Sequence, residues 1–416
     1  MRGMKEIKGE QYLNELISAR ENKLIKVITG IRRSGKSYLL DPIFKNYLIS
    51  NGIREDHIIK LDLDLIENSK YKDSIELFNY VMNNVKDDNM YYILLDEIQL
   101  VKDFENVLNS FLKKPNLDVY VTGSNSKFLS SDIITEFRGR STEIRIYPLS
   151  FKEFVEIKEE PEDKAWKEYV LYGGLPPVVI QDNEKQKREY LQNLFEMTYL
   201  KDIIERNDIK RKDVLDGIVN ILASSIGSLT NPMNIYKTYL SIWDKDISLN
   251  TIISYIEHLE NAFLVKKVER YDVKGRKHIS TPFKYYFTDL GLRNVRLNFR
   301  QQEENHIMEN IIYNELLQRG YSIDVGVVEV RNSYGRTYYE IDFVCNMASN
   351  RYYIQSALNI DTPEKNYQES RSLNCIGDNF KKIIVVKDDI NLWHNEDGIL
   401  IIGIKEFLLN KNSLEL

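Results

Sequence analysis

The feature that most constrains the fold is a glycine-containing turn between an apolar segment and a helical one. The stretch LIKVITGIRRSGKSYLL places the apolar residues 24–29 before the pattern Gly-x-x-x-x-Gly-Lys-Ser of residues 30–37. A turn of this kind, between a strand and a helix, surrounds phosphate groups with backbone N–H groups. The sequence therefore predicts an α/β fold in which a parallel sheet carries a nucleotide at one edge.

The residue types of this loop predict their roles. Lys36 should reach the β- and γ-phosphates, and the Ser37 hydroxyl should bind Mg²⁺. A chance basic residue in a glycine turn is the alternative, and the strand-loop-helix context argues against it. The residues expected to bind the nucleotide in this loop are Gly30, Ile31, Arg32, Arg33, Ser34, Gly35, Lys36, Ser37 and Tyr38.

A nucleotide site with a metal also needs carboxylates at the end of a neighbouring strand. In MYYILLDEIQLV, the apolar residues 91–95 are followed by Asp96 and Glu97. We expect Asp96 to hold Mg²⁺ and Glu97 to activate the attacking water. The tetrapeptide Asn-Lys-x-Asp that reads guanine does not occur, which favours ATP. The pair of motifs predicts Mg²⁺-dependent ATP hydrolysis.

Two further polar segments are candidates for contacts with the γ-phosphate. Residues 117–122 read as the next strand and end at Gly123, so that Ser124 or Asn125 could sense the nucleotide or cap a following helix. Beyond them, Arg138 and Arg140 flank Gly139. Arg140 is the favoured arginine for stabilising transferred charge, in cis or from a neighbouring subunit, and a surface ion pair is the alternative.

After Pro148 the strand-helix alternation gives way to helical patterns, which suggests a helical lid. Residues 248–261 read as a helix, and two short strands follow around Gly275, which is the pattern of a winged helix. This hairpin could bind DNA phosphates, or its charges could simply face water. Its basic residues are Lys266, Lys267, Arg270, Lys274, Arg276 and Lys277.

Several segments occur in an order that resembles one family. They are GIRRSGKS, LLDEIQ, VTGSNSKFLS, RGR, PLSFKEF and YGGLPPVV, followed by YLKDIIERNDI, KYYFTDLGLRN and ENIIYNELLQRGY. Together they resemble bacterial and archaeal ATPases of the AAA+ superfamily, close to its signal-transducing branch, which carry a C-terminal domain called DUF4143. The resemblance spans nearly the whole chain and implies ATP binding. It also implies a third role for the winged helix, which is to pack on the ATPase and transmit its nucleotide state.

The C-terminal region resembles the restriction-endonuclease-like fold. Active members place an acid on the second strand and acid-x-Lys on the third, where they bind Mg²⁺. In EIDFVCNMASNRYYIQSA, Asp342 fits the first acid, whereas Gln355 and Ala357 stand where the second acid and the lysine belong. We interpret the domain as degenerate and predict no nuclease activity. An ATP-gated nuclease that uses Asp342, helped by Glu309, Glu315 or Glu340, is the alternative.

Composition limits the partners and the compartment. A net charge of -6 argues against a uniformly basic surface, so DNA binding would need a local patch such as the hairpin. The two cysteines and the lack of any apolar run near ~18 residues predict a cytoplasmic protein without a membrane segment. A protein partner or a homo-oligomer is open, as is a nucleotide switch with little turnover. The expected domains are 1–150 (ATPase core), 151–300 (lid and winged helix) and 301–416 (nuclease-like).

Overall fold

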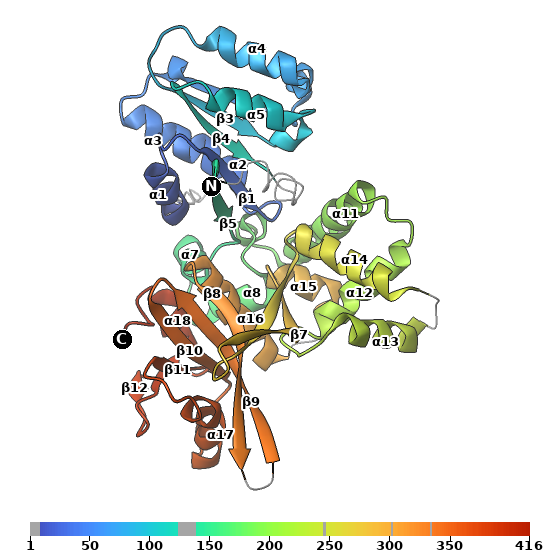
Figure 1. The fold of residues 1–416 in the computed structure, drawn as a ribbon, viewed down its shortest axis with the longest axis vertical. Helices are drawn as coiled ribbons and strands as arrows, with labels where there is room; N and C mark the ends of the chain where they lie inside the picture. Colours follow the sequence, from blue (N-terminus) through green and yellow to red (C-terminus); the bar gives the residue numbers. More distant parts are fainter. Residues whose placement is uncertain (1–8, 124–138, 244–246, 301–302, 333–334) are drawn as a thin grey trace. The chain divides into compact units, whose positions relative to one another are not determined.

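The computed structural model describes residues 9–123, 139–243, 247–300, 303–332 and 335–416. The chain divides into two compact units (Figure 1). The N-terminal unit comprises Met1–Pro148 with Asn261–Phe263, and the C-terminal unit comprises Leu149–Glu260 with Leu264–Leu416. Each unit is built on a sheet of its own, so the expected α/β class is confirmed. No helix of the described residues is long and apolar enough to cross a membrane.

The N-terminal unit contains a five-stranded parallel sheet in the order β2-β3-β4-β1-β5. Its central strands are buried on both faces, as expected for a parallel sheet that is covered on both sides. Because all five strands run the same way, their carboxyl ends meet at one edge. The strands are β1 Ile25–Gly30, β2 Ile58–Asp62, β3 Tyr91–Asp96, β4 Leu117–Thr122 and β5 Ser141–Ile146.

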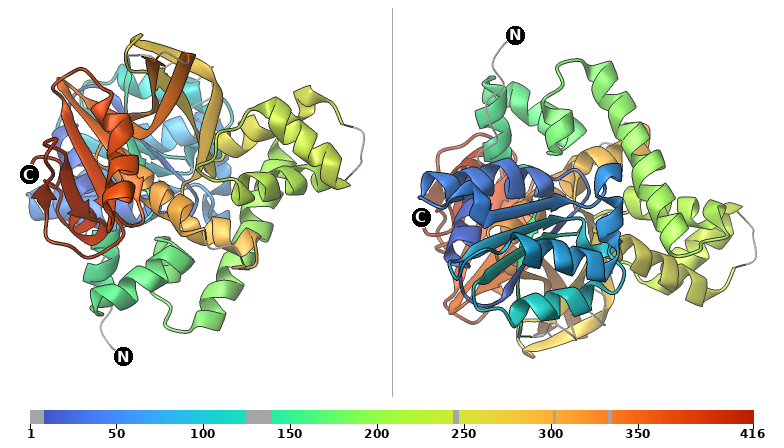
Figure 2. Two further views of the ribbon diagram at one scale, coloured as in Figure 1. Left: turned by 90° about the horizontal axis from the view of Figure 1, so that it is seen from below. Right: turned by 90° about the horizontal axis from the view of Figure 1, so that it is seen from above.

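Helices cover both faces of this sheet (Figure 2, right). Ile93 and Leu95 of β3 pack with α4 and α5, whereas Tyr92 and Leu94 pack with α1 and the segment from η1 to α3. The helices are α1 Glu10–Ser18, α2 Lys36–Tyr38, η1 Leu39–Phe44, α3 Lys45–Ser50, η2 Glu55–His57, η3 Ile66–Lys72, α4 Ser74–Asn84, η4 Ile98–Leu100 and α5 Phe104–Leu112.

The first half of the C-terminal unit is helical, as the sequence patterns indicate. Its first helix, α7, begins with a capping box, in which Ser150 accepts from the Glu153 N–H and the Glu153 carboxylate accepts from Ser150. The helices are α7 Phe151–Lys158, α8 Glu162–Tyr172, α9 Pro176–Val179, α10 Glu184–Asn193, η6 Leu194–Leu200, α11 Lys201–Arg206, α12 Lys212–Ser224, α13 Pro232–Trp243 and α14 Leu249–Asn261.

The second half holds a mixed eight-stranded sheet in the order β12-β13-β11-β10-β9-β8-β6-β7. Its strands are β6 Val265–Asp272, β7 Lys277–Phe287, β8 Ser322–Asn332, β9 Gly335–Met347, β10 Asn350–Ala357, β11 Lys381–Val386, β12 Trp393–His394 and β13 Leu400–Gly403. The accompanying helices are α15 Leu290–Arg296, α16 Glu304–Gln318, α17 Pro363–Asn374 and α18 Ile404–Leu409.

The hairpin β6–β7 is part of this sheet. The sequence predicts this hairpin as a wing of the middle region, but β6 pairs in parallel with β8, with Arg270 opposite Val325. A two-stranded hairpin alone buries little, and pairing with β8 satisfies one edge of it. The sheet therefore crosses the boundary that was expected at residue 300.

Two of the resembling segments, YGGLPPVV and KYYFTDLGLRN, meet at Asp289. Its buried carboxylate accepts from the N–H of Gly174 at 2.8 Å and from the N–H of Leu292 at 3.1 Å. Gly173 has φ 74°, and a Cβ there would lie 2.3 Å from an Asp289 oxygen, so only glycine fits. Burial raises the pKa of Asp289 to about 6, against the lowering effect of these hydrogen bonds. The glycine pair thus accommodates a buried carboxyl group.

Candidate nucleotide site

The loop between β1 and α2 requires its glycines. Gly30 has φ 139°, and a Cβ at this position would lie 2.2 Å from the carbonyl oxygen of Ile146. Gly35 has φ 105°, which other residues rarely adopt. Ile31, Ser34 and Lys36 are buried within the loop. The predicted loop residues are therefore together at the carboxyl end of β1; Arg33, Ser37 and Tyr38 are exposed there, and Arg32 is half-buried.

Lys36 lies inside the loop. Its Nζ donates to the carbonyl oxygens of Gly30 and Ile31, at 3.0 Å each. Burial lowers the pKa of Lys36 to about 8, although the charges of Glu97 and Asp96 oppose this effect. Peptide carbonyls stabilise an ammonium less than an anion does, so a phosphate would be a stronger partner. The loop presents a buried cation whose closest bonded partners are neutral.

The two expected metal-binding residues, Ser37 and Asp96, are brought into contact. The Ser37 side chain hydrogen-bonds to the Asp96 carboxylate, which also accepts from the Thr122 hydroxyl. Burial raises the pKa of Asp96, and these two hydrogen bonds lower it in part. Asp62 ends β2 directly beside Asp96 and adds a second carboxylate at this edge.

Glu97 follows in a left-handed backbone conformation, with φ 54° and ψ 47°. Its N–H donates to the Thr122 hydroxyl at 3.0 Å, and its carboxylate accepts from the side-chain amide of Gln99. Thr122 therefore binds both Asp96, which ends β3, and Glu97, which follows it. Neither Thr122 nor Gln99 was among the predicted site residues, although Gln99 lies in the LLDEIQ segment that carried the family resemblance.

The residues of this edge fit a magnesium nucleotide. The buried Ser34 hydroxyl has no hydrogen-bond partner within the described residues, which suits a loop made to receive phosphate oxygens. Mg²⁺ usually takes one or two protein oxygens and completes its shell with phosphates and water. Ser37 and Asp96 are such a pair. No group of three or more His, Cys, Asp or Glu residues able to hold a metal occurs in the described part of the chain.

Arg140 is not brought to this edge, which corrects its expected role in cis. It precedes β5, and β5 begins opposite Ile25, at the start of β1, whereas the loop follows Gly30 at the other end. Six strand residues at ~3.3 Å each separate the two ends. The exposed Arg140 guanidinium instead donates to Asn109 at 3.3 Å. Ser124, Asn125 and Arg138 lie outside the described residues.

A second group of charges, the Lys284 cluster, consists of Lys284, Tyr286, Glu309, Glu340 and Asp342. Lys284 comes from β7, and its Nζ lies 2.7 Å from Glu309, 2.8 Å from Glu340 and 3.7 Å from Asp342. Tyr286 donates to Glu309. The three carboxylates raise the pKa of Lys284 even though burial alone would lower it. Burial and the charge of Glu309 raise the pKa of Asp342 to about 8.

This cluster changes the interpretation of β10. The sequence predicts Gln355 and Ala357 in the positions of an acid and a lysine beside Asp342. Gln355 does lie beside Asp342, whose N–H donates to the Gln355 Oε1 at 3.4 Å, and the Gln355 Nε2 also reaches Glu369 of α17 at 3.5 Å. Ala357 packs in the core with Leu373 of α17. The ammonium that β10 lacks is supplied by Lys284, which sequence reasoning missed. Its signal was a lysine inside the apolar run PFKYYF.

The basic hairpin is partly neutralised. Lys267 pairs with Glu269 at 2.9 Å, and Lys274 donates to the carbonyl oxygen of Glu329 at 3.0 Å. Two other basic residues, Arg276 and Lys277, are exposed at the turn. The hairpin therefore presents a few basic side chains among acidic ones rather than a continuous positive surface.

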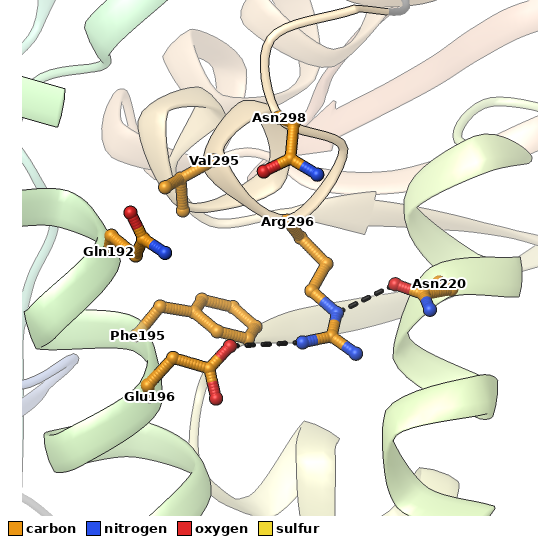
Figure 3. A pocket seen from close by; sticks show the side chains of 7 residues that line it. All are labelled: Gln192, Phe195, Glu196, Asn220, Val295, Arg296 and Asn298. Carbon is orange, nitrogen blue, oxygen red and sulfur yellow. Dashed lines mark hydrogen bonds and ion pairs between the residues drawn. The ribbon is translucent and has the colours of Figure 1, made fainter.

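A polar cavity of about 260 Å³ lies between η6, α12 and α15 (Figure 3). Arg296 points into it and donates to Asn220 at 2.7 Å and to Glu196 at 3.1 Å. A third bond joins Arg296 to Asp216 at 2.9 Å. The guanidinium thus already pairs with two carboxylates, which makes the cavity a poor anion site. Its lining residues are Gln192, Phe195, Glu196, Asn220, Val295, Arg296 and Asn298.

Comparison with known protein families identifies two regions of the chain. Residues 22–155 match the family described as AAA domain, and residues 163–303 match the domain of unknown function DUF8612. The match over 163–303 is thus to a different domain from the DUF4143 that the resemblance implied; DUF4143 itself is not shown.

Solved structures with some likeness include the Aeropyrum pernix ORC1 protein in complex with DNA and Cdc6p from Pyrobaculum aerophilum. The first is 11% identical with a TM-score of 0.28, covering 70% of this chain and 92% of that one. The second is 11% identical with a TM-score of 0.30, covering 74% and 95%. Likeness at this level says nothing about function.

Two curated relatives cover most of this chain. The uncharacterized protein MJ1544 of Methanocaldococcus jannaschii is 28% identical over 408 residues, which are 92% of this chain and 86% of that protein. A protein of Haemophilus influenzae, named only "Uncharacterized protein", is 36% identical over 412 residues, which are 97% of this chain and 98% of that protein. The chain therefore belongs to the same family as the Haemophilus influenzae protein, and its N-terminal part is an AAA domain with a phosphate-binding loop.

Proposed function

We propose that the N-terminal unit binds ATP with Mg²⁺ and hydrolyses it, and that the nucleotide state alters how the C-terminal unit engages a partner. The observation that carries this proposal is the meeting of three groups at one sheet edge. They are the buried Lys36 ammonium, the Ser37–Asp96 pair and the Glu97 carboxylate.

In this proposal each side chain has a defined task. Lys36 exchanges its carbonyl partners for the β- and γ-phosphates, and loop N–H groups surround the same oxygens. Ser37 and Asp96 hold Mg²⁺, which when bound neutralises charge on the phosphates. Glu97 accepts the proton of the attacking water. Asn125 and Ser124 remain predicted to contact the γ-phosphate.

The test is ATP hydrolysis by the purified chain and by Glu97→Gln. We expect turnover in the wild type, loss of turnover in Glu97→Gln, and retained ATP affinity in that variant, because glutamine keeps the size but cannot take a proton. Tight ATP binding without measurable phosphate release in the wild type would favour a nucleotide switch instead. Normal turnover in Glu97→Gln would contradict the assignment.

For the partner, we propose DNA bound through the hairpin β6–β7, without sequence readout. The exposed Arg276 and Lys277 at its turn are suited to phosphate contacts. DNA should raise ATP turnover of the wild type, and Arg276→Glu with Lys277→Glu should abolish that rise while leaving basal turnover unchanged. A rise that persists in the double variant would exclude this surface. No response to DNA would move the proposal to a protein partner.

Arg140 keeps one predicted role, which is to act in trans in a homo-oligomer. It is exposed and lies away from the loop of its own subunit. Arg140→Ala should then lower turnover only under conditions in which the protein self-associates. A loss that does not depend on protein concentration would contradict the trans role.

A second candidate function is nucleic-acid cleavage, because Lys284 brings an ammonium beside Asp342. In the structure this ammonium is itself the cation among Glu309, Glu340 and Asp342. Carboxylates so engaged are poor ligands for a metal ion. We therefore propose that the C-terminal unit does not cleave. Mg²⁺-dependent cleavage that disappears in Asp342→Ala would establish the nuclease instead.

A further inference from the structure

Gln99 is placed beside Glu97 by the short helix η4 Ile98–Leu100. Its Nε2 donates to the Glu97 carboxylate, and the opposite amide orientation would set a carbonyl oxygen against that carboxylate. Its Oε1 is buried and has no hydrogen-bond partner among the residues that the structure describes. A buried acceptor without a hydrogen-bond partner is uncommon in a folded protein, and a ligand or a water is expected to bind it.

The Glu97 backbone is fixed on the other side. Its N–H donates to Thr122, and its left-handed φ of 54° turns the chain directly after β3. The main chain of Glu97 is thus held by the neighbouring strand, and its side chain is held by Gln99. The unpartnered oxygen of Gln99 belongs to the same amide that holds the carboxylate.

We propose that Gln99 is a positioning residue for ATP hydrolysis, which orients the Glu97 carboxylate through Nε2 and binds the attacking water through Oε1. This inference rests on the proposed ATPase function. One O–H of the water points to Glu97 and the other to Gln99, so that a lone pair faces the γ-phosphorus. Two fixed acceptors define the orientation of a water, whereas one leaves it free to rotate.

Glu97 takes one proton from the water, the water oxygen forms a bond to the γ-phosphorus, and the bond from that phosphorus to the β,γ-bridging oxygen breaks with its electron pair on ADP. ADP and inorganic phosphate leave, and Glu97 then releases its proton to solvent. Gln99 gains and loses no proton, and it acts only through the two hydrogen bonds.

The experiment compares Gln99→Leu and Gln99→Glu with the wild type. Leucine removes both amide groups at similar size, and glutamate keeps an acceptor but places a second carboxylate beside Glu97. The matched control is Gln11→Leu, because Gln11 on α1 likewise hydrogen-bonds to a glutamate, Glu15. For each variant we would measure kcat, KM, equilibrium ATP affinity and thermal stability.

We expect Gln99→Leu to lower kcat by ~10-fold to 100-fold with ATP affinity within ~2-fold of the wild type. Gln99→Glu keeps an acceptor for the water but replaces the donor to Glu97 with a second carboxylate, so its kcat should also fall while ATP affinity is retained. Gln11→Leu should change none of these values.

Three outcomes would overturn the proposal. Wild-type or faster turnover in Gln99→Leu would mean that the amide is dispensable or restrains Glu97. A fall in kcat that is accompanied by an equal loss of ATP affinity or by a loss of thermal stability would mean a structural role only. If Gln99→Leu does not fold, wild-type kcat in Gln99→Glu would overturn it equally. Loss of turnover in Glu97→Gln with normal Gln99→Leu would sink this inference alone, whereas turnover independent of Glu97 would sink the proposed function.

Discussion

Lys36 and Lys284 are both buried lysines beside carboxylates, one in each unit, and they differ in what neutralises them. Lys36 is bonded at 3.0 Å to two backbone carbonyls, and burial lowers its pKa to about 8. Lys284 lies 2.7 Å from Glu309 and 2.8 Å from Glu340, and its pKa is raised. Among the described residues, the Lys36 ammonium has no carboxylate bonded to it at these distances, whereas the Lys284 ammonium is neutralised within the protein. The same residue types can thus form either a site suited to an anionic ligand or an ion cluster that is already neutral.

The largest expected effect concerns the Lys284 cluster. Lys284→Met should destabilise the C-terminal unit by ~3–5 kcal/mol, because it leaves the buried Glu309 carboxylate without its cation. Denaturant unfolding of the full chain would measure the change. Lys387→Met is the matched control, since its pair with Glu304 at 2.7 Å is exposed and should contribute only ~0–1 kcal/mol. Equal effects of the two variants would break the comparison.

A substitution in the nucleotide site should change ATP affinity rather than the stability of the protein. Lys36→Ala should weaken ATP binding by ~100-fold or more, because the phosphates lose their buried cationic partner. Equilibrium binding of a fluorescent ATP analogue would test this. Lys45→Ala, which removes the ion pair between Lys45 on α3 and Glu55 on η2, should leave affinity unchanged. Unaltered binding by Lys36→Ala would refute the nucleotide site.

The pH dependence of stability should reveal the cluster. Asp342 has a pKa of about 8 in the folded chain and an ordinary one of 3.8, so the folded state binds the proton more tightly. This contribution is present below pH 4 and is lost as the pH rises to 8. Asp289, with a folded pKa of about 6, contributes in the same sense only up to that pH.

Between pH 6 and 8, stability should therefore fall by at most ~1.4 kcal/mol per pH unit from Asp342, and Asp342→Asn should flatten this slope. Thermal unfolding at a series of pH values would measure it. Lys36 affects the pH dependence of stability only above this window, because its pKa is about 8 in the folded chain and 10.5 ordinarily. An unchanged slope in Asp342→Asn would assign the effect to other groups.

The smallest expected effect concerns the Thr122 hydroxyl, which binds Asp96 and Glu97 in the nucleotide site. Thr122→Val keeps the shape but removes the bonds to Asp96 and to the Glu97 N–H, and it should lower kcat by ~10-fold. Thr122→Ser restores the hydroxyl and should recover most of the activity. A loss shared by both variants would point to packing of the methyl group instead.

The sequence predicted best where residues close in the chain form the site. The loop at residues 30–37 has a fixed spacing, and its glycines are required by backbone geometry that the structure shows at Gly30 and Gly35. Asp96 was found because a polar residue after an apolar strand lies at the sheet edge. These features depend on local backbone form and on the alternation of strands and helices.

The sequence predicted poorly where strands from distant parts of the chain pair. Arg140 follows Gly139 in the RGR segment, but the parallel register of β5 with β1 places it at the edge of the sheet opposite the phosphate-binding loop. Gln355 lies beside Asp342 as expected, but the ammonium near Asp342 comes from Lys284. Lys284 belongs to β7, a strand that the sequence predicts in another domain.

By itself, therefore, the sequence determined the α/β class, the phosphate-binding loop and the acidic end of β3, since short-range spacing and apolar periodicity encode them. Only the tertiary structure decided which charges meet. Register and sheet order bring Lys284 to the carboxylates and remove Arg140 from the loop, because pairing between distant strands depends on the whole core rather than on any one segment.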